Sequence, residues 1–284
     1  MNGVLDQGYY EQGLYTPGSY DDYIKDIKLV KSLGFNTIRK HIKIEAPRWY
    51  YECDKLGILV WQDFINGGGK YKASTVMFPL ITDVHLNDHK YKTFAREDKE
   101  GREFAKQEFK DEIEYLYNHP SIVLWTIFNE GWGQFDSKEI LEEMKKLDST
   151  RLFDHASGWH DQGISDVKSM HVYFKKVKIP SSRKTKDRSI VLSEFGGYVL
   201  PIEGHKRDGK KTYRAFKSAT DWTGAYEKLI NRDVIHNIPK GLSAAIYTQL
   251  SDVEDELNGF VTFDREVIKV DVDKINQINS KVKY

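Results

Sequence analysis

At 284 residues the chain can bury one large core, and its length is close to the roughly 250 residues of a single (β/α)8 barrel. Its 43 basic residues balance 43 acidic ones, which excludes a global field that would recruit nucleic acid or an anionic membrane and favours a neutral small substrate. The single cysteine excludes an internal disulfide, and no apolar run approaches the ~18 residues of a membrane span.

Strand and helix signals alternate along the first 65 residues. Met1-Asn2-Gly3 is followed neither by a basic segment nor by a signal-type apolar core, so we expect no signal peptide in this chain and leave its location open, with the cytoplasm as the default. Ser19 is a suitable N-cap for a first helix that Gly34 ends, while Pro47 begins a second helix that Gly57 ends. Three strands are predicted around these helices, at residues 3–6, 35–39 and 58–61.

The next third of the chain begins with a long, poorly periodic insertion over residues 66–100, which we interpret as an elaborated loop. An amphipathic helix over residues 101–117 leads into a fourth strand over residues 122–128, whose continuous apolar run suits a strand buried on both faces. Ser137 is expected to cap the following helix. Four further apolar runs predict strands at residues 152–156, 170–173, 190–194 and 244–249.

Eight short buried strands alternate with helices, and no change of composition suggests a linker. This pattern predicts an α/β fold, a closed parallel (β/α)8 TIM barrel that forms a single domain over residues 1–284. The connection between the sixth and seventh strands is the least helical and is strongly basic. Such a run can bind phosphates, but it lacks interleaved aromatic residues, so a solvated loop is the preferred interpretation of Lys175, Lys176, Lys178, Arg183, Lys184, Lys186 and Arg188.

In a barrel of this type, functional residues project from the carboxyl ends of the strands. Glu130 and Glu194 stand out there, because each directly terminates an apolar strand and is followed by glycine within two residues. A structural salt bridge is the alternative for either glutamate alone. Two carboxylates at one rim favour glycoside hydrolysis, in which one protonates the departing oxygen and the other attacks or stabilises the anomeric carbon.

Longer motifs around these glutamates resemble the catalytic barrel of glycoside hydrolase family 2, the family of β-galactosidases, β-glucuronidases and β-mannosidases. The resemblance rests on Asn118–Trp125 running into Asn129-Glu130-Gly131, and on Ser193–Gly196. Residues 3–9, 34–39, 49–61 and 249–254 also match. The resemblance implies a retaining β-glycosidase that is β-galactosidase-like. In such an enzyme Glu130 would be the general acid/base, Glu194 the nucleophile and Asn129 the residue that contacts the 2-hydroxyl of the sugar.

Three departures from the family pattern accompany the resemblance. His41 lies one place earlier than the histidine of the usual Arg-x-x-His-Tyr-Pro motif. The segment 257–260 lacks the lysine with which glucuronidases hold the sugar carboxylate, which argues against a glucuronide. The β-sandwich domains that precede the barrel in the family are absent from this chain, so either the chain is a fragment or the upstream domains are missing. From the resemblance we expect a carbohydrate substrate and, for a fragment, further β-sandwich domains of a longer enzyme as partners.

Polar and aromatic residues at other strand ends are expected to bind the sugar, namely Asp6, His41, Asp63, Trp159, His171, Tyr173 and Gln249. We expect neither a metal nor a cofactor, because no His-x-His or His-Glu-x-x-His spacing occurs. Two alternatives stay open: a non-catalytic carbohydrate-binding barrel, and an endo-acting glycoside hydrolase of a related barrel family. For a retaining enzyme the two carboxyl groups should lie about 5 to 5.5 Å apart, with a raised pKa on Glu130.

Overall fold

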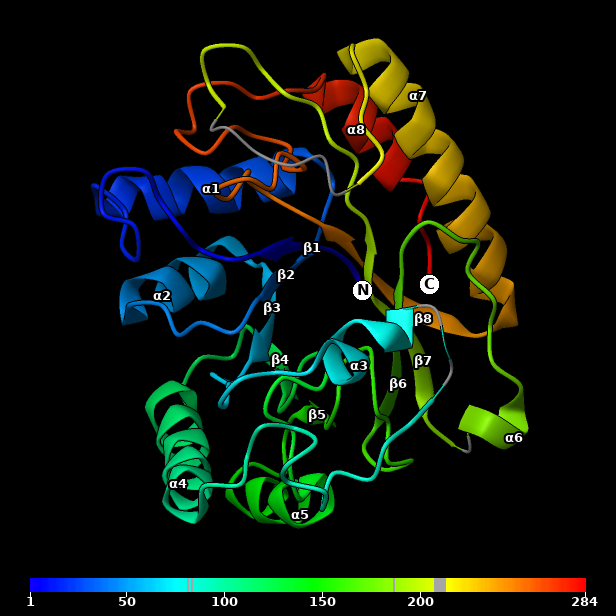
Figure 1. Cartoon of the computed structure of the whole chain (residues 1–284). Coiled ribbons are helices and arrows are strands. Elements are labelled where there is room, and N and C mark those ends of the chain that lie inside the picture. Colours follow the sequence, from blue (N-terminus) through cyan, green and yellow to red (C-terminus); the bar gives the residue numbers. More distant parts are fainter. Residues whose placement is uncertain (81, 83, 186, 207–212) are drawn as a thin grey trace.

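The structure is a computed structural model that describes residues 1–80, 82, 84–185, 187–206 and 213–284. Eight strands form one parallel sheet in the order β5-β4-β3-β2-β1-β8-β7-β6. Figure 1 shows the strands inside and the helices outside. The strands are β1 (Asn2–Asp6), β2 (Thr37–Lys40), β3 (Leu59–Asp63), β4 (Ile122–Thr126), β5 (Leu152–Asp154), β6 (Val167–Val172), β7 (Ser189–Gly196) and β8 (Leu242–Thr248).

Local capping signals account for the ends of several helices. The turn after α2 takes a left-handed conformation at Gly57, with φ of 70°, which glycine adopts without strain. Asp98 caps the longest helix, α4, by accepting from the backbone of Glu100 and Gly101. The α-helices are α1 (Tyr20–Ser32), α2 (Pro47–Leu56), α3 (Ala73–Val76), α4 (Lys99–Leu116), α5 (Ser137–Leu147), α6 (Ser182–Thr185), α7 (Ala219–Leu229) and α8 (Val272–Asn279). Further helical segments are η1 (Phe78–Leu80), η2 (Ile230–Val234) and η3 (Ile235–Lys240).

The barrel closes at β5 and β6 by a few hydrogen bonds and not by a strand ladder. The backbone N–H of Asp166 donates to the carbonyl of Phe153 at 3.1 Å, and the N–H of Phe153 donates to the carboxylate of Asp166 at 2.8 Å. In the described residues no helix separates β5 from β6, and only the single turn of α6 lies between β6 and β7. The outer face of β6 is therefore covered by loops.

Two sets of buried side chains stabilise this architecture. The larger set fills the layer between the strands and the surrounding helices, and it includes Val30, Trp49, Phe109, Met144 and Trp222. The smaller set fills the barrel interior, where side chains from six strands are at most 2% exposed, and consists of Leu5, Trp61, Leu124, Val167, Val191, Ala244 and Ile246. Burial of this kind dominates the stability of such folds.

The predicted barrel of eight parallel strands is confirmed, with differences at particular elements. The sixth strand begins at Val167, ahead of the predicted start, because its outward positions carry polar residues such as Lys168. The expected cap Ser137 is instead the first residue of α5; Asp136 holds the N-cap position, and the Ser137 hydroxyl donates to Asp88. The long loop contains α3 and η1, and α7 and α8 are additional to the predicted helices.

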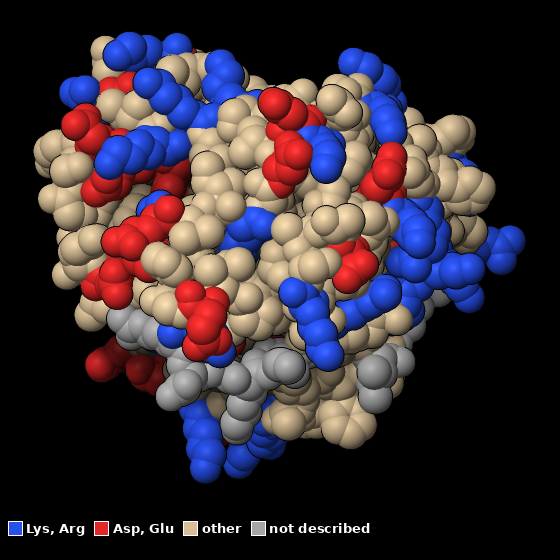
Figure 2. Space-filling view, turned by 90° about the horizontal axis from the view of Figure 1, so that it is seen from above, with Lys and Arg blue, Asp and Glu red and all other residues tan. Residues whose placement is uncertain are grey.

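Charged residues of both signs are mixed on the face of the molecule that is seen from above. Figure 2 shows basic and acidic side chains interspersed over the face seen from above, with the densest group of basic side chains along its right-hand side. Within the described part of the chain, none of the helices combines the length and the apolar character needed to cross a membrane.

Candidate active site

A buried arginine joins the carboxyl ends of four strands. Arg39, at 0% exposure, donates to both oxygens of Asp63 at 2.9 to 3.2 Å. It also donates to Oε1 of Glu194 and to the carbonyl of Ser193, both at 3.0 Å, and to Oδ1 of Asn129 at 2.8 Å. All five guanidinium hydrogens thus have acceptors on β3, β4 and β7, which fixes the carboxylates relative to one another.

Glu130 lies just beyond β4, in a backbone conformation with φ of 51° that non-glycine residues rarely adopt. Its side chain is 20% exposed, and Oε1 lies 2.8 Å from Nδ1 of His171. Burial raises the pKa of Glu130 to about 7, against the opposing charges of His41 and Arg39. The next residue must be glycine, because a Cβ on Gly131 would lie 2.6 Å from the ring of His160.

Glu194 lies within β7 and differs from Glu130 in its hydrogen-bond partners. Its Oε1 accepts from Arg39, and its Oε2 accepts from the hydroxyl of Tyr173 at 2.7 Å. That hydroxyl also lies 3.0 Å from Oγ1 of Thr248. The side chain is 8% exposed. Charge-assisted hydrogen bonds hold both oxygens of this carboxylate, as a fixed anion at a barrel mouth requires.

His171 lies between the two glutamates. Its Nδ1 is 2.8 Å from Glu130, and its Nε2 is 3.5 Å from Oε1 of Glu194 and 2.9 Å from the hydroxyl of Ser157. One oxygen of each carboxylate and one ring nitrogen of His171 all lie within 4.8 Å of one another. Burial lowers the pKa of His171 to about 4, so the imidazole is neutral and carries one N–H at neutral pH.

A chain of hydrogen bonds sets which nitrogen carries that proton. The hydroxyl of Ser193 donates to the carbonyl of Met170 at 3.2 Å, and the hydroxyl of Ser157 donates to Ser193 at 3.0 Å. Because Ser157 has then used its only proton, it accepts from Nε2–H of His171. Nδ1 is left as an acceptor that faces Glu130, and it stabilises the protonated carboxyl.

The other predicted site residues divide into two groups. His41, Asp63 and Asn129 belong to the Arg39 network, and Nδ1 of His41 lies 3.0 Å from Asp63. Trp159 packs edge-on against His171, with ring centroids 5.4 Å apart. The structure thus brings these residues together with Glu130 and Glu194.

Asp6 and Gln249 belong to two other sets of hydrogen bonds, separate from that of Arg39. The carboxylate of Asp6 is 1% exposed and forms an ion pair with Lys40 at 2.6 Å, while its other oxygen accepts from the backbone of Gly8. The side-chain amide of Gln249 donates to the carboxylate of Glu256 at 2.9 Å and to the side-chain oxygen of Asn258 at 2.8 Å. Internal partners occupy both side chains, so their contact with a sugar stays a prediction.

Arg39, Ser157 and Ser193 contact the predicted site residues and are additional to the predicted set. Arg39 ends a predicted strand, which is a usable signal, whereas a serine carries no signal of its own in the sequence. Two aromatic pairs also offer exposed ring faces. The ring of Trp132 stacks on Tyr71, and that of Phe174, which is 70% exposed, stacks on Tyr213.

Three groups in the described part of the chain place ligand-type atoms within 4.8 Å of one another. One is the cluster of Glu130, His171 and Glu194 itself. The others lie outside it, and they are His89 with Asp136 and Glu139, and His205 with Asp264 and Glu266. Exposed acidic clusters of this kind are common without an ion, so the geometry alone assigns no metal.

Comparison with known proteins identifies the family. Residues 18–266 match the family model described as Glycosyl hydrolases family 2, TIM barrel domain. The chain belongs to this family. Its members are glycoside hydrolases, the class expected from the sequence, so the resemblance noted there is confirmed.

Individual relatives of family 2 are similar to the chain at low identity. The β-galactosidase of Priestia megaterium is 26% identical over 196 residues, 65% of this chain and 16% of that protein. The β-mannosidase B of Thermothelomyces thermophilus is 29% identical over 105 residues, 37% of this chain and 10% of that protein. The chain therefore spans only a small part of the length of these relatives.

Solved structures of family 2 enzymes share the fold. The β-galacturonidase from Eisenbergiella tayi, bound to galacturonate, aligns with 98% of this chain and 50% of its own, with a TM-score of 0.69 at 18% identity. The FMN-binding β-glucuronidase from Facaelibacterium prausnitzii L2-6 aligns with 100% of this chain and 44% of its own, with a TM-score of 0.68 at 20% identity.

Proposed function

We propose that this chain is the catalytic barrel of a retaining β-glycosidase, with Glu130 as general acid/base and Glu194 as nucleophile. The observation that carries the proposal is the approach of the two carboxylates, which have oxygens within 4.8 Å of each other. This supports the ~5 to 5.5 Å carboxyl separation of retaining enzymes over the ~6.5 to 9.5 Å that leaves room for an attacking water in inverting ones.

The surroundings of the two glutamates support this division of roles. With a pKa raised to about 7 and an acceptor nitrogen facing it, Glu130 holds a proton for the departing glycosidic oxygen. Glu194, held by Arg39 and Tyr173, attacks the anomeric carbon as the bond to that oxygen breaks, and a covalent glycosyl-enzyme forms. Water then enters, Glu130 removes its proton, and the hydroxide displaces Glu194 with net retention.

The substrate we propose is a β-linked sugar, with a β-galactoside first. Several curated relatives are β-galactosidases, at about a quarter sequence identity. Residues 257–260 after β8 further support a neutral sugar, because this stretch carries no lysine, and its Asn258 is fully buried against Gln249. By family resemblance Asn129 contacts the 2-hydroxyl, and its Oδ1 is held by Arg39.

The chain is proposed to act beside further β-sandwich domains. The relatives are several times longer than the part that this chain matches, which is consistent with additional domains. Loops at a barrel mouth are often completed by a neighbouring domain. We therefore expect the barrel alone to fold but to act weakly, and activity equal to that of a longer form would refute this expectation.

The test is a screen of aryl β-glycosides of galactose, glucose, mannose and glucuronic acid. Proton NMR of the first product should show the β-anomer, and an initial α-anomer would overturn retention. A 2-fluoro glycoside with a good leaving group should label Glu194. Labelling at Glu130 would reverse the assignment. Sugar binding without any turnover would instead support the carbohydrate-binding barrel, and hydrolysis only within longer chains would support an endo-acting enzyme.

A further inference from the structure

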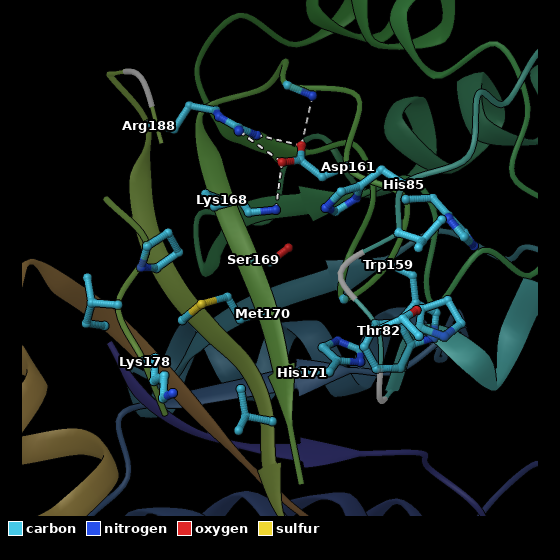
Figure 3. Close-up of a pocket in the computed structure, with 18 of the residues that line it drawn as sticks. Thr82, His85, Trp159, Asp161, Lys168, Ser169, Met170, His171, Lys178 and Arg188 are labelled. Carbon is cyan, nitrogen blue, oxygen red and sulfur yellow. Dashed lines mark hydrogen bonds and ion pairs between the residues drawn. The ribbon is translucent and has the colours of Figure 1, made fainter. Parts of the chain in front are cut away.

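A pocket of about 950 Å³ lies against β6, beside the catalytic pair but without either glutamate in its wall. Figure 3 shows Arg188 and Lys168 pointing toward Asp161 at one end, and His171 and Trp159 at the other. The remaining walls come from the loop before β6, the loop after it and the segment that follows η1.

The pocket exists because helices do not cover β6. In a (β/α)8 barrel each strand usually packs its outer face under a helix. Here, within the described residues, only loops and the single turn of α6 flank this strand. The outward residues Lys168, Met170 and Val172 stay half-buried, while Ser169 and His171 between them are buried. A cavity therefore remains where a helix would otherwise pack.

The lining carries an excess of positive charge in a chain whose total charge is zero. Five of its residues are basic and one, Asp161, is acidic. Asp161 is held by two hydrogen bonds from Arg188, at 2.7 and 3.0 Å, and by Lys168 at 2.7 Å. One carboxylate thus faces two cations, and three further lysines, all exposed, lie at the mouth, namely Lys175, Lys176 and Lys178.

This arrangement of charges favours the binding of an anion. Concave sites lined by one sign of charge concentrate ligands of the opposite sign. In the basic run after β6, Lys175, Lys176 and Lys178 are exposed, in agreement with the solvated loop expected from the sequence, and they line the cavity together with Lys168 and Arg188. Lys186 lies outside the described residues. Sulfate, phosphate and carboxylate share the chemistry that Lys and Arg recognise.

The position of the pocket relates it to the leaving-group side of the active site. His171 lines the pocket and hydrogen-bonds through Nδ1 to Glu130, and Trp159 lines it beside His171. The general acid of a glycosidase lies next to the departing oxygen. We propose that the pocket binds an anionic group, such as a sulfate, on the leaving-group part of the substrate, an inference that rests on the function proposed above.

The first test compares two β-linked disaccharides that differ only in a sulfate on the reducing-end sugar. The double substitution Lys176→Ala and Lys178→Ala should raise KM for the sulfated disaccharide by roughly three- to ten-fold, the effect of losing two exposed ion pairs. KM for the neutral disaccharide and both kcat values should stay unchanged. Arginine at both positions should restore the sulfated KM.

A charge-matched control separates the pocket from general electrostatics. Lys138 and Lys146 are exposed residues of α5 outside the pocket, and replacing both with alanine should leave the sulfated-to-neutral KM ratio unchanged. A ratio near one in the unmodified chain, or an equal loss in both double variants, would overturn the inference.

The second test does not depend on turnover. Sodium sulfate or inorganic phosphate is titrated against the chain at constant ionic strength, with chloride as reference, and the midpoint of thermal unfolding is followed. If sulfate stabilises the unmodified chain but not the Lys176→Ala, Lys178→Ala variant, the pocket binds free anions. If only the KM values show a preference for the sulfated disaccharide, the pocket binds an anionic group carried by the substrate. Either effect would support the pocket as an anion site. Absence of both effects would refute it, even where the chain hydrolyses no glycoside.

Discussion

Removing the hydroxyl of Ser157 should lower the pKa of Glu130 without touching either glutamate. Ser157 accepts from Nε2–H of His171 at 2.9 Å, and this bond keeps Nδ1 free to accept from the protonated carboxyl of Glu130. In Ser157→Ala, Nε2–H would lose its acceptor at 2.9 Å and keep only Oε1 of Glu194 at 3.5 Å, so the imidazole shifts its proton to Nδ1. It then donates to Glu130 and favours the carboxylate.

The magnitude follows from one hydrogen bond. The net contribution of one hydrogen bond, about 0.5 to 1.5 kcal/mol, corresponds to a decrease of up to about one unit in the pKa of Glu130, since one pKa unit is ~1.4 kcal/mol. The pKa of Glu130 would fall from about 7 toward about 6. Because the acid must be protonated, the alkaline limb of kcat/KM moves down in pH by that amount, and activity at pH 7 on poor leaving groups falls about five-fold.

The assay is the pH profile of kcat/KM with an alkyl or disaccharide leaving group, repeated with an activated aryl leaving group that needs no acid. Ser251→Ala is the matched control, because Ser251 is buried and its hydroxyl makes no hydrogen bond among the described residues. An alkaline limb that stays within 0.2 pH units, roughly the precision of such profiles, in Ser157→Ala would refute the proton assignment on His171.

Three further predictions concern the charge of Glu130, the hydrogen bond that Tyr173 donates to Glu194, and the expected absence of a metal requirement. Because burial raises the folded-state pKa of Glu130 to about 7, above its unfolded value of roughly 4.3, Glu130 lowers the free energy of unfolding as pH rises between these values. Urea titration of Glu130→Gln should therefore show a gain of up to about 3 kcal/mol in the free energy of unfolding at pH 8 relative to pH 4, and the absence of a pH-dependent gain would contradict the raised pKa. Tyr173→Phe removes one donor to Glu194 and should lower kcat by roughly ten- to 100-fold, whereas Tyr226→Phe, which loses a buried bond to Asn279, should leave kcat unchanged. Dialysis against EDTA should not alter activity, and a loss restored by a divalent cation would indicate a metal at one of the three clusters.

Local patterns in the sequence were sufficient for most of the strands, because these strands carry their burial in a continuous apolar run. Ile122–Thr126 is the clearest case, with a helix predicted on each side of it. The same reasoning located Glu130 and Glu194, since a carboxylate directly after a buried strand lies at the rim where barrels hold their functional groups. Alternating polar strands such as Val167–Val172 were harder to delimit, because their outward side chains depend on what covers them.

Only the tertiary structure decided how the site residues act on one another. The network of Arg39 joins residues up to 155 positions apart, and distances of this kind depend on how the barrel closes and not on sequence spacing. Asp6 and Asp63 end strands as predicted, yet their carboxylates are held by Lys40 and Arg39 from the neighbouring strand. The raised pKa of Glu130 and the basic pocket beside β6 likewise arise from burial and from missing helices, which are properties of the packed chain and not of any single segment.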